Sequence, residues 1–171
     1  NNAYPFVRLH QPSAFYGVNS RPLGNDTIDH AGWNAGLYEL ASGAEVVAYF
    51  DQVMREQFIP SGRVQYFPNC EYLSDGTIAS RVSGKTWTVE AAKTVDATYM
   101  NVTVPSVTMP AYEIGVGVKC FALNELPKHA NSTANFVIIG AGKTGIDACL
   151  WLLLNEVDPN RITWVMPRDS W

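Results

Sequence analysis

Three glycines near the end of the chain have the spacing of a phosphate-binding turn. Gly140, Gly142 and Gly145 form the pattern G-x-G-x-x-G directly after the apolar run 136–139. In this pattern the first glycine makes a tight turn, the second lets the backbone approach a pyrophosphate, and the third lets a helix pack closely on a strand. The helix that follows would present its N-terminal amides and the positive end of its dipole to an anion. The spacing therefore predicts a dinucleotide-binding turn.

The same stretch contains Gly142-Lys143-Thr144, which is also how the phosphate loop of many ATPases and kinases ends. That loop requires G-x-x-x-x-G-K-[ST], so its first glycine would stand at position 137. The residue there is Val137, inside the predicted strand. Without that glycine the loop cannot open around a β-phosphate, so the ATPase or kinase alternative is disfavoured. Lys143 and Thr144 stay candidate phosphate contacts, although Lys143 could equally point to solvent.

The residue that selects between nicotinamide cofactors is expected about 20 residues beyond the glycines, where an acid accepts the ribose 2′-OH or an arginine faces a 2′-phosphate. This sequence has Arg168 followed by Asp169 at that distance. The planar, permanently charged guanidinium of Arg168 suits a phosphate, which favours NADP. Asp169 keeps NAD open as the alternative.

The elements around the glycines predict a β-α-β unit. An apolar strand at 136–139, a helix at 144–155 and a second strand at 162–166 follow one another with short loops between them. This order is typical of a parallel sheet in the α/β class. Asp147, one turn into the helix, would help the helix begin through its interaction with the helix dipole.

A second helix is predicted earlier in the chain. Ser42 and Glu45 have the spacing of a capping box, in which the two side chains satisfy free amides at the start of a helix. The helix should run to about residue 58. Its apolar face should consist of Val46, Phe50, Val53, Met54 and Phe58.

Short β-rich runs follow this helix, with Asp-Gly and Ser-Gly turns among them. Such turns between β-rich runs are typical of antiparallel hairpins. We expect an antiparallel β-meander, with strands at 64–67, 71–73, 77–82, 87–90 and 94–97.

Composition excludes some classes of partner. The formal net charge is −4, and the basic residues are scattered singly, so no stripe suited to nucleic acid is present. The longest apolar stretch, 148–154, is well short of the roughly 20 residues that span a bilayer, so no membrane segment is expected. Three widely spaced cysteines without a C-x-x-C motif are expected to be free thiols, which favours a cytoplasmic protein.

Taken in order, these pieces resemble the flavin-dependent monooxygenases and related FAD/NADPH oxidoreductases. The stretch "YPFVRLHQPSAFYGVNSRPLG" (4–24) is similar to the family's Tyr-Pro and Pro-Ser segment near the flavin. The helix at 42–58 would precede the strand that leads to the adenine end of FAD, and "RVQYFPNCEYL" (63–73) is similar to that strand and its return. Residues 136–168 are similar to the NADPH-binding unit. The resemblance implies an α/β flavoprotein with a Rossmann β-α-β unit at the C-terminal end and an antiparallel β-meander.

The resemblance also implies which residues lie near the flavin of FAD. His10 and Gln11 would donate to the polar edge of the flavin ring, and the alternative is that they pack within the loop. The remaining candidate contacts belong to the Pro-Ser segment and to the family's Ala-Thr-Gly, and they are Pro12, Ser13, Ala97 and Thr98. In this sequence a tyrosine replaces the glycine of Ala-Thr-Gly, and the family's first, FAD-binding G-x-G-x-x-G unit lies outside the chain.

A catalytic role is implied for one residue of the same N-terminal stretch. Asn19 is similar to the family's asparagine beside the oxygen-reactive face of the flavin, although its distance to the following proline is one residue longer here. An amide can donate to and accept from a flavin hydroperoxide, which would steady that intermediate. The alternative is that Asn19 forms an Asx-turn that caps the loop.

The resemblance implies three parts in the chain. Residues 1–104 would be part of an FAD-binding domain, 105–134 a linker, and 135–171 the start of an NADP-binding Rossmann domain. Because the chain starts without methionine and stops just after the second strand, we expect an internal fragment of a larger protein that is inactive alone.

The activity implied is that of an enzyme in which NADPH delivers hydride to FAD. Reduced FAD would then react with molecular oxygen and oxygenate a small-molecule substrate, or pass electrons onward. A nucleotide-binding module without oxygenase activity and a non-oxygenating flavin reductase are the alternatives. A disulfide reductase would need a redox C-x-x-C, which this chain lacks.

Overall fold

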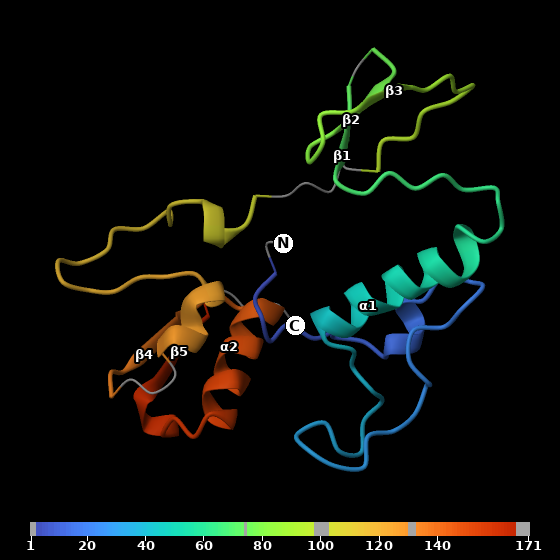
Figure 1. Ribbon diagram of the computed structural model, residues 1–171. Helices are drawn as coiled ribbons and strands as arrows, with labels where there is room; N and C mark the ends of the chain where they lie inside the picture. The colour runs from blue at the N-terminus through green and yellow to red at the C-terminus, as the bar shows by residue number, and fades with distance from the viewer. Residues whose placement is uncertain (1–2, 74, 98–102, 130–132, 167–171) are drawn as a thin grey trace. The chain divides into compact units, whose positions relative to one another are not determined.

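The computed structural model describes residues 3–73, 75–97, 103–129 and 133–166 (Figure 1). The chain forms two compact units. The first consists of Asn1–Tyr49 with Thr103–Trp171, and the second of Phe50–Val102. The first unit therefore combines part of the predicted FAD-binding region with the predicted linker and nucleotide-binding region.

The C-terminal part of the first unit is a strand, a helix and a parallel strand. β4 (Phe136–Ile139) leads into α2 (Lys143–Leu154), and a short 3-10 turn, η5 (Pro159–Arg161), leads into β5 (Ile162–Val165). β4 and β5 pair in parallel, from Phe136 opposite Ile162 to Ile139 opposite Val165. The predicted order of elements and the mixed helix and strand content are confirmed.

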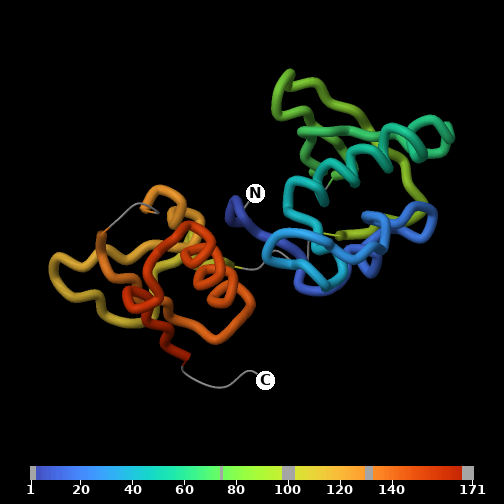
Figure 2. The backbone as a smooth tube through the Cα atoms, turned by 90° about the horizontal axis from the view of Figure 1, so that it is seen from below, coloured from blue at the N-terminus to red at the C-terminus, as the bar shows by residue number. Residues whose placement is uncertain are grey.

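One face of this two-stranded sheet carries α2, which runs beside both strands (Figures 1 and 2). Leu152 on α2 is 0% exposed and lies at the centre of the core between helix and sheet. The other buried residues of the cluster are Leu126, Phe136, Ala148 and Val157. This cluster exists because alternate residues of each strand point to the same face, where the apolar side of α2 meets them.

The opposite face of the sheet is apolar but exposed. Val137, Ile139 and Val165 are 61%, 50% and 42% exposed. Parallel sheets are almost always covered on both faces, which is why their strands are apolar throughout. The exposed face is thus the kind of surface that a further layer of structure covers.

Two 3-10 turns lie within the predicted linker, η3 (Pro105–Val107) and η4 (Leu123–His129). Leu126 of η4 is 4% exposed and belongs to the core cluster under α2. The ring of Phe121 stacks on His129 with centroids 4.4 Å apart. The end of the predicted linker is therefore packed as part of the C-terminal core.

The N-terminal part of the first unit is mostly loop, with one 3-10 turn, η1 (Ser13–Tyr16), before α1 (Gly43–Val53). The capping box is confirmed, because the Ser42 amide and hydroxyl both donate to Glu45 Oε2 across 2.7 Å and the Glu45 amide donates to Ser42 Oγ across 3.3 Å. A π-helical turn, η2 (Met54–Phe58), continues α1 as far as predicted.

The predicted apolar face of α1 was partly wrong. Phe50 is 48% exposed, whereas Tyr49 is 6% and Val53 1% exposed. Tyr49 is buried in place of Phe50 because its hydroxyl finds two main-chain partners, described below. A phenol whose oxygen is hydrogen-bonded can be buried without leaving a polar group unsatisfied.

The second unit contains a three-stranded antiparallel sheet of β1 (Cys70–Tyr72), β2 (Thr77–Ser80) and β3 (Thr86–Thr88), in the order β1-β2-β3. The predicted meander is confirmed for these strands. The prediction of strands at 64–67 and 94–97 was wrong, because these residues do not pair with the sheet. Their valines are exposed, and the exposed fraction of Val95 is 86%.

Within the described ranges, no helix has the length and apolar content needed to cross a membrane.

Candidate functional site

The first glycine of the predicted turn is held on both sides by β5. Gly140 directly follows β4 and has φ +128°, a conformation that strongly favours glycine. Its amide donates to the Val165 carbonyl across 3.0 Å. Its carbonyl accepts a hydrogen bond from Trp164 Nε1 across 2.7 Å. The backbone at the tight turn is therefore fixed before α2 begins.

The third glycine lies where the helix touches the strand. A Cβ at Gly145 would stand 2.5 Å from the Gly140 carbonyl oxygen and 3.2 Å from Trp164 Nε1. The first distance is far below van der Waals contact, and its partner is backbone that β5 already holds. Only a residue without a side chain allows α2 to lie this close to the loop, which is the packing role expected from the spacing.

The middle glycine, in contrast, faces open space. Gly142 is the N-cap of α2, with φ −79° and ψ 174°, and no side chain caps the helix there. A Cβ at Gly142 would meet no atom within 4 Å. The first amides of an α-helix have no partner within the helix, so this end can receive an anion through main-chain N–H groups.

The polar side chains of Lys143 and Thr144 lie near Tyr4 of the N-terminal segment. Lys143 Nζ pairs with the Asp147 carboxylate, donates to the Arg8 carbonyl oxygen and lies 3.4 Å from the Tyr4 hydroxyl oxygen. The side chain of Thr144 also acts on Tyr4, whose pKa it lowers. The Lys143 side chain therefore contacts Asp147 and the N-terminal segment, and it is 32% exposed.

Tyr4 is the centre of this polar cluster. Its hydroxyl donates to Asp147 Oδ2 across 2.6 Å. The pKa of Tyr4 is raised well above the usual value, first because the phenol is partly buried, and then because its hydroxyl donates a hydrogen bond to the Asp147 carboxylate, which would repel a phenolate. Thr144 acts in the opposite direction. Tyr4 is therefore a neutral donor that holds the N-terminal segment against α2.

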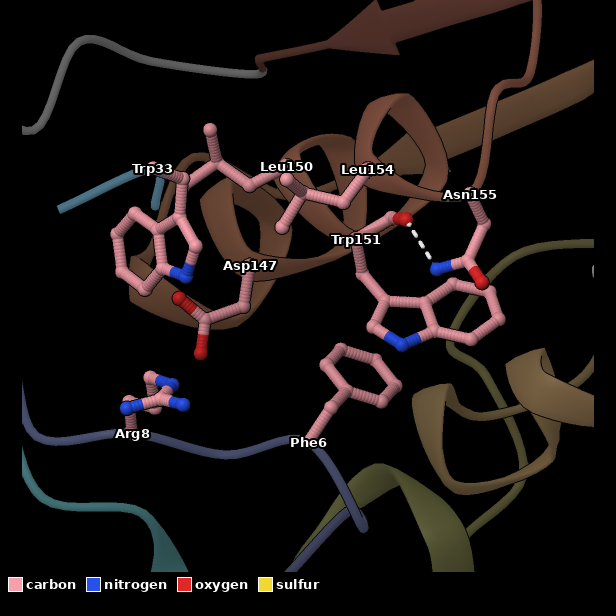
Figure 3. Close-up of a pocket in the computed structure, with 8 residues that line it drawn as sticks. All are labelled: Phe6, Arg8, Trp33, Asp147, Leu150, Trp151, Leu154 and Asn155. Carbon is pink, nitrogen blue, oxygen red and sulfur yellow. Dashed lines mark hydrogen bonds between the residues drawn. The ribbon is translucent and has the colours of Figure 1, made fainter. Parts of the chain in front are cut away.

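A pocket of about 240 Å³ lies beside this cluster, on the side of α2 away from the sheet (Figure 3). The N-terminal loops contribute Phe6, Arg8 and Trp33, and Phe6 stacks on Trp151 of α2 with centroids 5.0 Å apart. The guanidinium carbon of Arg8 lies 5.8 Å from the centre of the Trp33 ring. The helix completes the lining with Asp147, Leu150, Trp151, Leu154 and Asn155.

The residues expected near the flavin ring lie around η1. His10 and Gln11 are exposed and both adjoin Tyr16, whose ring is 6.3 Å from that of His10 and whose hydroxyl donates to Gln11 Oε1 across 3.2 Å. Pro12 is the N-cap of η1. Ser13 is 1% exposed, and its hydroxyl donates to the Glu39 carbonyl across 2.9 Å and accepts from the Ala41 amide across 2.8 Å. Ser13 thus holds two loop segments together.

Asn19 is exposed at the tip of a tight turn. Val18 and Arg21 flank the turn and form a bridge, with the Arg21 amide donating to the Val18 carbonyl across 3.0 Å. The Tyr49 hydroxyl accepts from the Val18 amide across 2.7 Å and donates to the Arg21 carbonyl. One side chain of α1 therefore clamps both ends of the turn that presents Asn19.

The remaining candidates are not part of these arrangements. Ala97 is exposed and belongs to the second unit. Thr98 and Arg168 lie outside the described residues, so the structure gives no geometry for them. No group of three or more potential metal ligands occurs among the residues that are described.

Sequence reasoning missed three residues that organise the site: Tyr4, Tyr49 and Trp164. Trp164 had a usable signal, because it lies two residues after Ile162 and so on the same face of its strand, toward α2. Tyr4 belongs to the Tyr-Pro stretch that carries the resemblance, but nothing in the sequence indicated its contact with α2, and Tyr49 had no signal. Their partners are 143 and up to 31 residues away in sequence.

Comparison with known proteins found relatives at the level of sequence. The chain is 55% identical over 169 residues to the uncharacterized protein Mb2023 of Mycobacterium bovis and to the uncharacterized protein Rv2000 of Mycobacterium tuberculosis. The aligned residues make up 99% of this chain. It spans 31% of the length of each of these relatives. No family model matches the chain. No solved structure matches it either.

Proposed function

We propose that this chain carries the NADP-binding β-α-β unit of a Rossmann domain in an FAD-dependent oxidoreductase. NADPH would deliver hydride to FAD, and the enzyme would oxygenate a small-molecule substrate with molecular oxygen. The relatives that match nearly the whole chain are about three times its length, and the activity proposed is that of the whole protein.

The observation that carries the proposal is the contrast between two glycines of one loop. Gly145 has backbone 2.5 Å from where its Cβ would be, whereas Gly142 has nothing within 4 Å. A glycine-rich loop that only connected a strand to a helix would need the close packing at Gly145, but it would not need open space at Gly142. Space in front of the helix N-terminus is what a pyrophosphate would occupy.

The exposed face of the β4–β5 sheet supports the same class of fold. Val137, Ile139 and Val165 form an apolar surface opposite α2. In a doubly wound α/β domain, helices on both faces cover such strands. A larger parallel sheet with a second helical layer is therefore part of the proposal.

The residues present fit the two cofactors unequally. The glycine turn fits a dinucleotide pyrophosphate, and Arg168 would select NADP by pairing with its 2′-phosphate. On the flavin side, the Ser13 hydroxyl bridges two main-chain groups, and Thr98 lies outside the described residues. The FAD part of the proposal rests on the resemblance.

The nucleotide site is tested on the full-length protein that contains this chain. NADPH bound at the glycine turn would lie near Trp164, so titration with NADPH should quench tryptophan fluorescence with saturation. NADH should bind more weakly than NADPH. The substitution Arg168→Ala should reduce the difference in affinity between the two nucleotides. Absence of saturable quenching by either nucleotide would contradict the site.

The flavin activity is tested on the full-length protein. We expect a purified protein with a flavin absorption spectrum that NADPH bleaches faster than NADH. A protein that stays colourless after FAD is added would favour the alternative, a nucleotide-binding module without oxygenase activity. Bleaching by NADPH without substrate oxygenation would instead indicate a flavin reductase.

A further inference from the structure

The side chain of Lys143 is fully engaged on the side of α2 that faces the N-terminal segment. Its ammonium group has three N–H donors, and three acceptors surround it: the Asp147 carboxylate, the Arg8 carbonyl oxygen and the Tyr4 hydroxyl oxygen. The side chains of Lys143 and Asp147 are only 32% and 16% exposed. A lysine in a phosphate-binding loop is thus held by protein groups on all of its donors.

We propose that Lys143 is a positioning residue that fastens the N-terminal segment to the nucleotide-binding helix, and that Asp147 keeps it from binding the nucleotide phosphates. This inference rests on the proposed function, because it assigns the phosphates to the glycine turn. It differs from the expectation that Lys143 contacts a phosphate. In this arrangement the main-chain amides at the start of α2 bind the pyrophosphate.

The geometry of the helix explains why Asp147 can restrain Lys143. The two residues are four positions apart on α2, so their side chains lie on the same face of the helix, one turn apart. Figure 3 shows the Asp147 carboxylate extending from α2 toward the segment that carries Arg8 and Phe6. The Tyr4 hydroxyl donates to the same carboxylate across 2.6 Å. Asp147 therefore accepts from both Lys143 and Tyr4.

The segment fastened in this way leads directly to the residues expected at the flavin. Two hydrogen bonds on either side of Arg8 connect it to the start of α1, from the Leu9 amide to the Ala41 carbonyl and from the Gly43 amide to the Val7 carbonyl, each across 2.9 Å. His10 follows Leu9 in sequence. The Lys143 contacts thus connect the first turn of the nucleotide helix to the chain that enters the predicted flavin site.

A double-mutant cycle with NADPH as the probe tests the proposal. Asp147→Asn removes the charge that restrains Lys143, so NADPH should bind about fivefold to tenfold more tightly as the lysine gains access to phosphate. This gain should disappear in the double variant Asp147→Asn with Lys143→Met. Lys143→Met alone should change the affinity by about twofold or less, comparable to a control, Lys128→Met, at an exposed lysine 3.9 Å from Glu125.

Hydrogen exchange supplies a second measurement that does not depend on nucleotide. Lys143→Met should accelerate exchange of the Val7 amide, which donates to the Tyr4 carbonyl across 3.2 Å, by about threefold or more. Lys128→Met should leave it unchanged.

The outcomes separate this proposal from the proposed function. Loss of NADPH affinity by about tenfold in Lys143→Met alone would overturn the proposal, because Lys143 would then bind phosphate already. A gain in NADPH affinity that persists in the double variant would overturn the proposal too. Removal of the Asp147 charge would then explain the tighter binding without any contact between Lys143 and phosphate. If the wild type does not bind NADPH, the proposed function fails, and unchanged Val7 exchange would independently overturn the fastening role.

Discussion

The indole Nε1 of Trp164 donates a hydrogen bond to the carbonyl oxygen of Gly140 across 2.7 Å. The same nitrogen lies 3.2 Å from the point where a Cβ of Gly145 would stand. One aromatic side chain on β5 therefore holds the carbonyl of the first glycine of the turn and leaves little room for a side chain at the third. The loop is held by the strand that follows the helix as well as by the strand that precedes it.

Replacing Trp164 with phenylalanine keeps the ring against α2 but removes the donor. We expect a loss of about 1 kcal/mol in the free energy of unfolding, because the Gly140 carbonyl loses its partner. NADPH should also bind more weakly, because the turn is less fixed. Thermal unfolding and NADPH titration check both effects. Trp87→Phe in the second unit is the control for loss of an indole, and an equal effect on NADPH binding there would contradict the role of Trp164.

Substitution of Gly145 should mainly lower stability, whereas substitution of Gly142 in the same loop should mainly weaken NADPH binding. Gly145→Ala should destabilise the fold by about 1 to 3 kcal/mol, because its methyl group would meet the Gly140 carbonyl and α2 would have to shift. Gly142→Ala should change the unfolding midpoint little but weaken NADPH binding, because its methyl group points into open space where the phosphates are expected.

Circular dichroism melting and nucleotide titration on both variants distinguish the two effects. If Gly142→Ala binds NADPH as the wild type does, the pyrophosphate does not lie at this turn.

The capping box of α1 should make stability depend on pH. The hydrogen bonds from Ser42 to the Glu45 carboxylate lower the pKa of Glu45. A carboxyl group whose pKa is lower in the folded state stabilises that state at pH values above its unfolded pKa, and this contribution disappears as pH falls through the folded pKa. Glu45→Gln keeps the hydrogen-bonding shape, so its stability should fall less on acidification.

Ser42→Ala should cost about 1 kcal/mol at neutral pH, because the first turn of α1 loses its cap. Melting curves of the two variants across the acidic range provide the measurement, with Ser106→Ala at an exposed serine as the control. Parallel pH profiles for wild type and Glu45→Gln would show that Glu45 does not cause the dependence.

Tyr49→Phe should loosen the turn that presents Asn19. The variant keeps the buried ring but removes the hydroxyl that accepts from the Val18 amide and donates to the Arg21 carbonyl. We expect a destabilisation of about 1 to 2 kcal/mol and faster hydrogen exchange at Val18. Tyr66→Phe, at a tyrosine that is 54% exposed, should have neither effect. Unchanged Val18 exchange in Tyr49→Phe would rule out the clamp.

The order and types of the local elements could be predicted from short-range patterns in the sequence. The glycine spacing and the two apolar runs predicted β4, α2 and β5, and the capping box predicted where α1 begins, because these signals depend on contacts within a few residues. The hairpin turns likewise predicted β1 to β3. The strands expected at 64–67 and 94–97 did not form, since a strand also needs a partner for its backbone, and local pattern does not supply one.

Which side chains of these elements contact one another depends on the packing of the folded chain. Tyr49 is buried instead of Phe50 because distant main-chain groups satisfy its hydroxyl. Lys143 is directed to Asp147 and Tyr4 because the N-terminal segment lies against α2. The contacts of Tyr49 with Val18 and Arg21 and of Lys143 with Tyr4 join residues separated by tens of positions or more, so they depend on how the elements pack, which no local spacing in the sequence encodes.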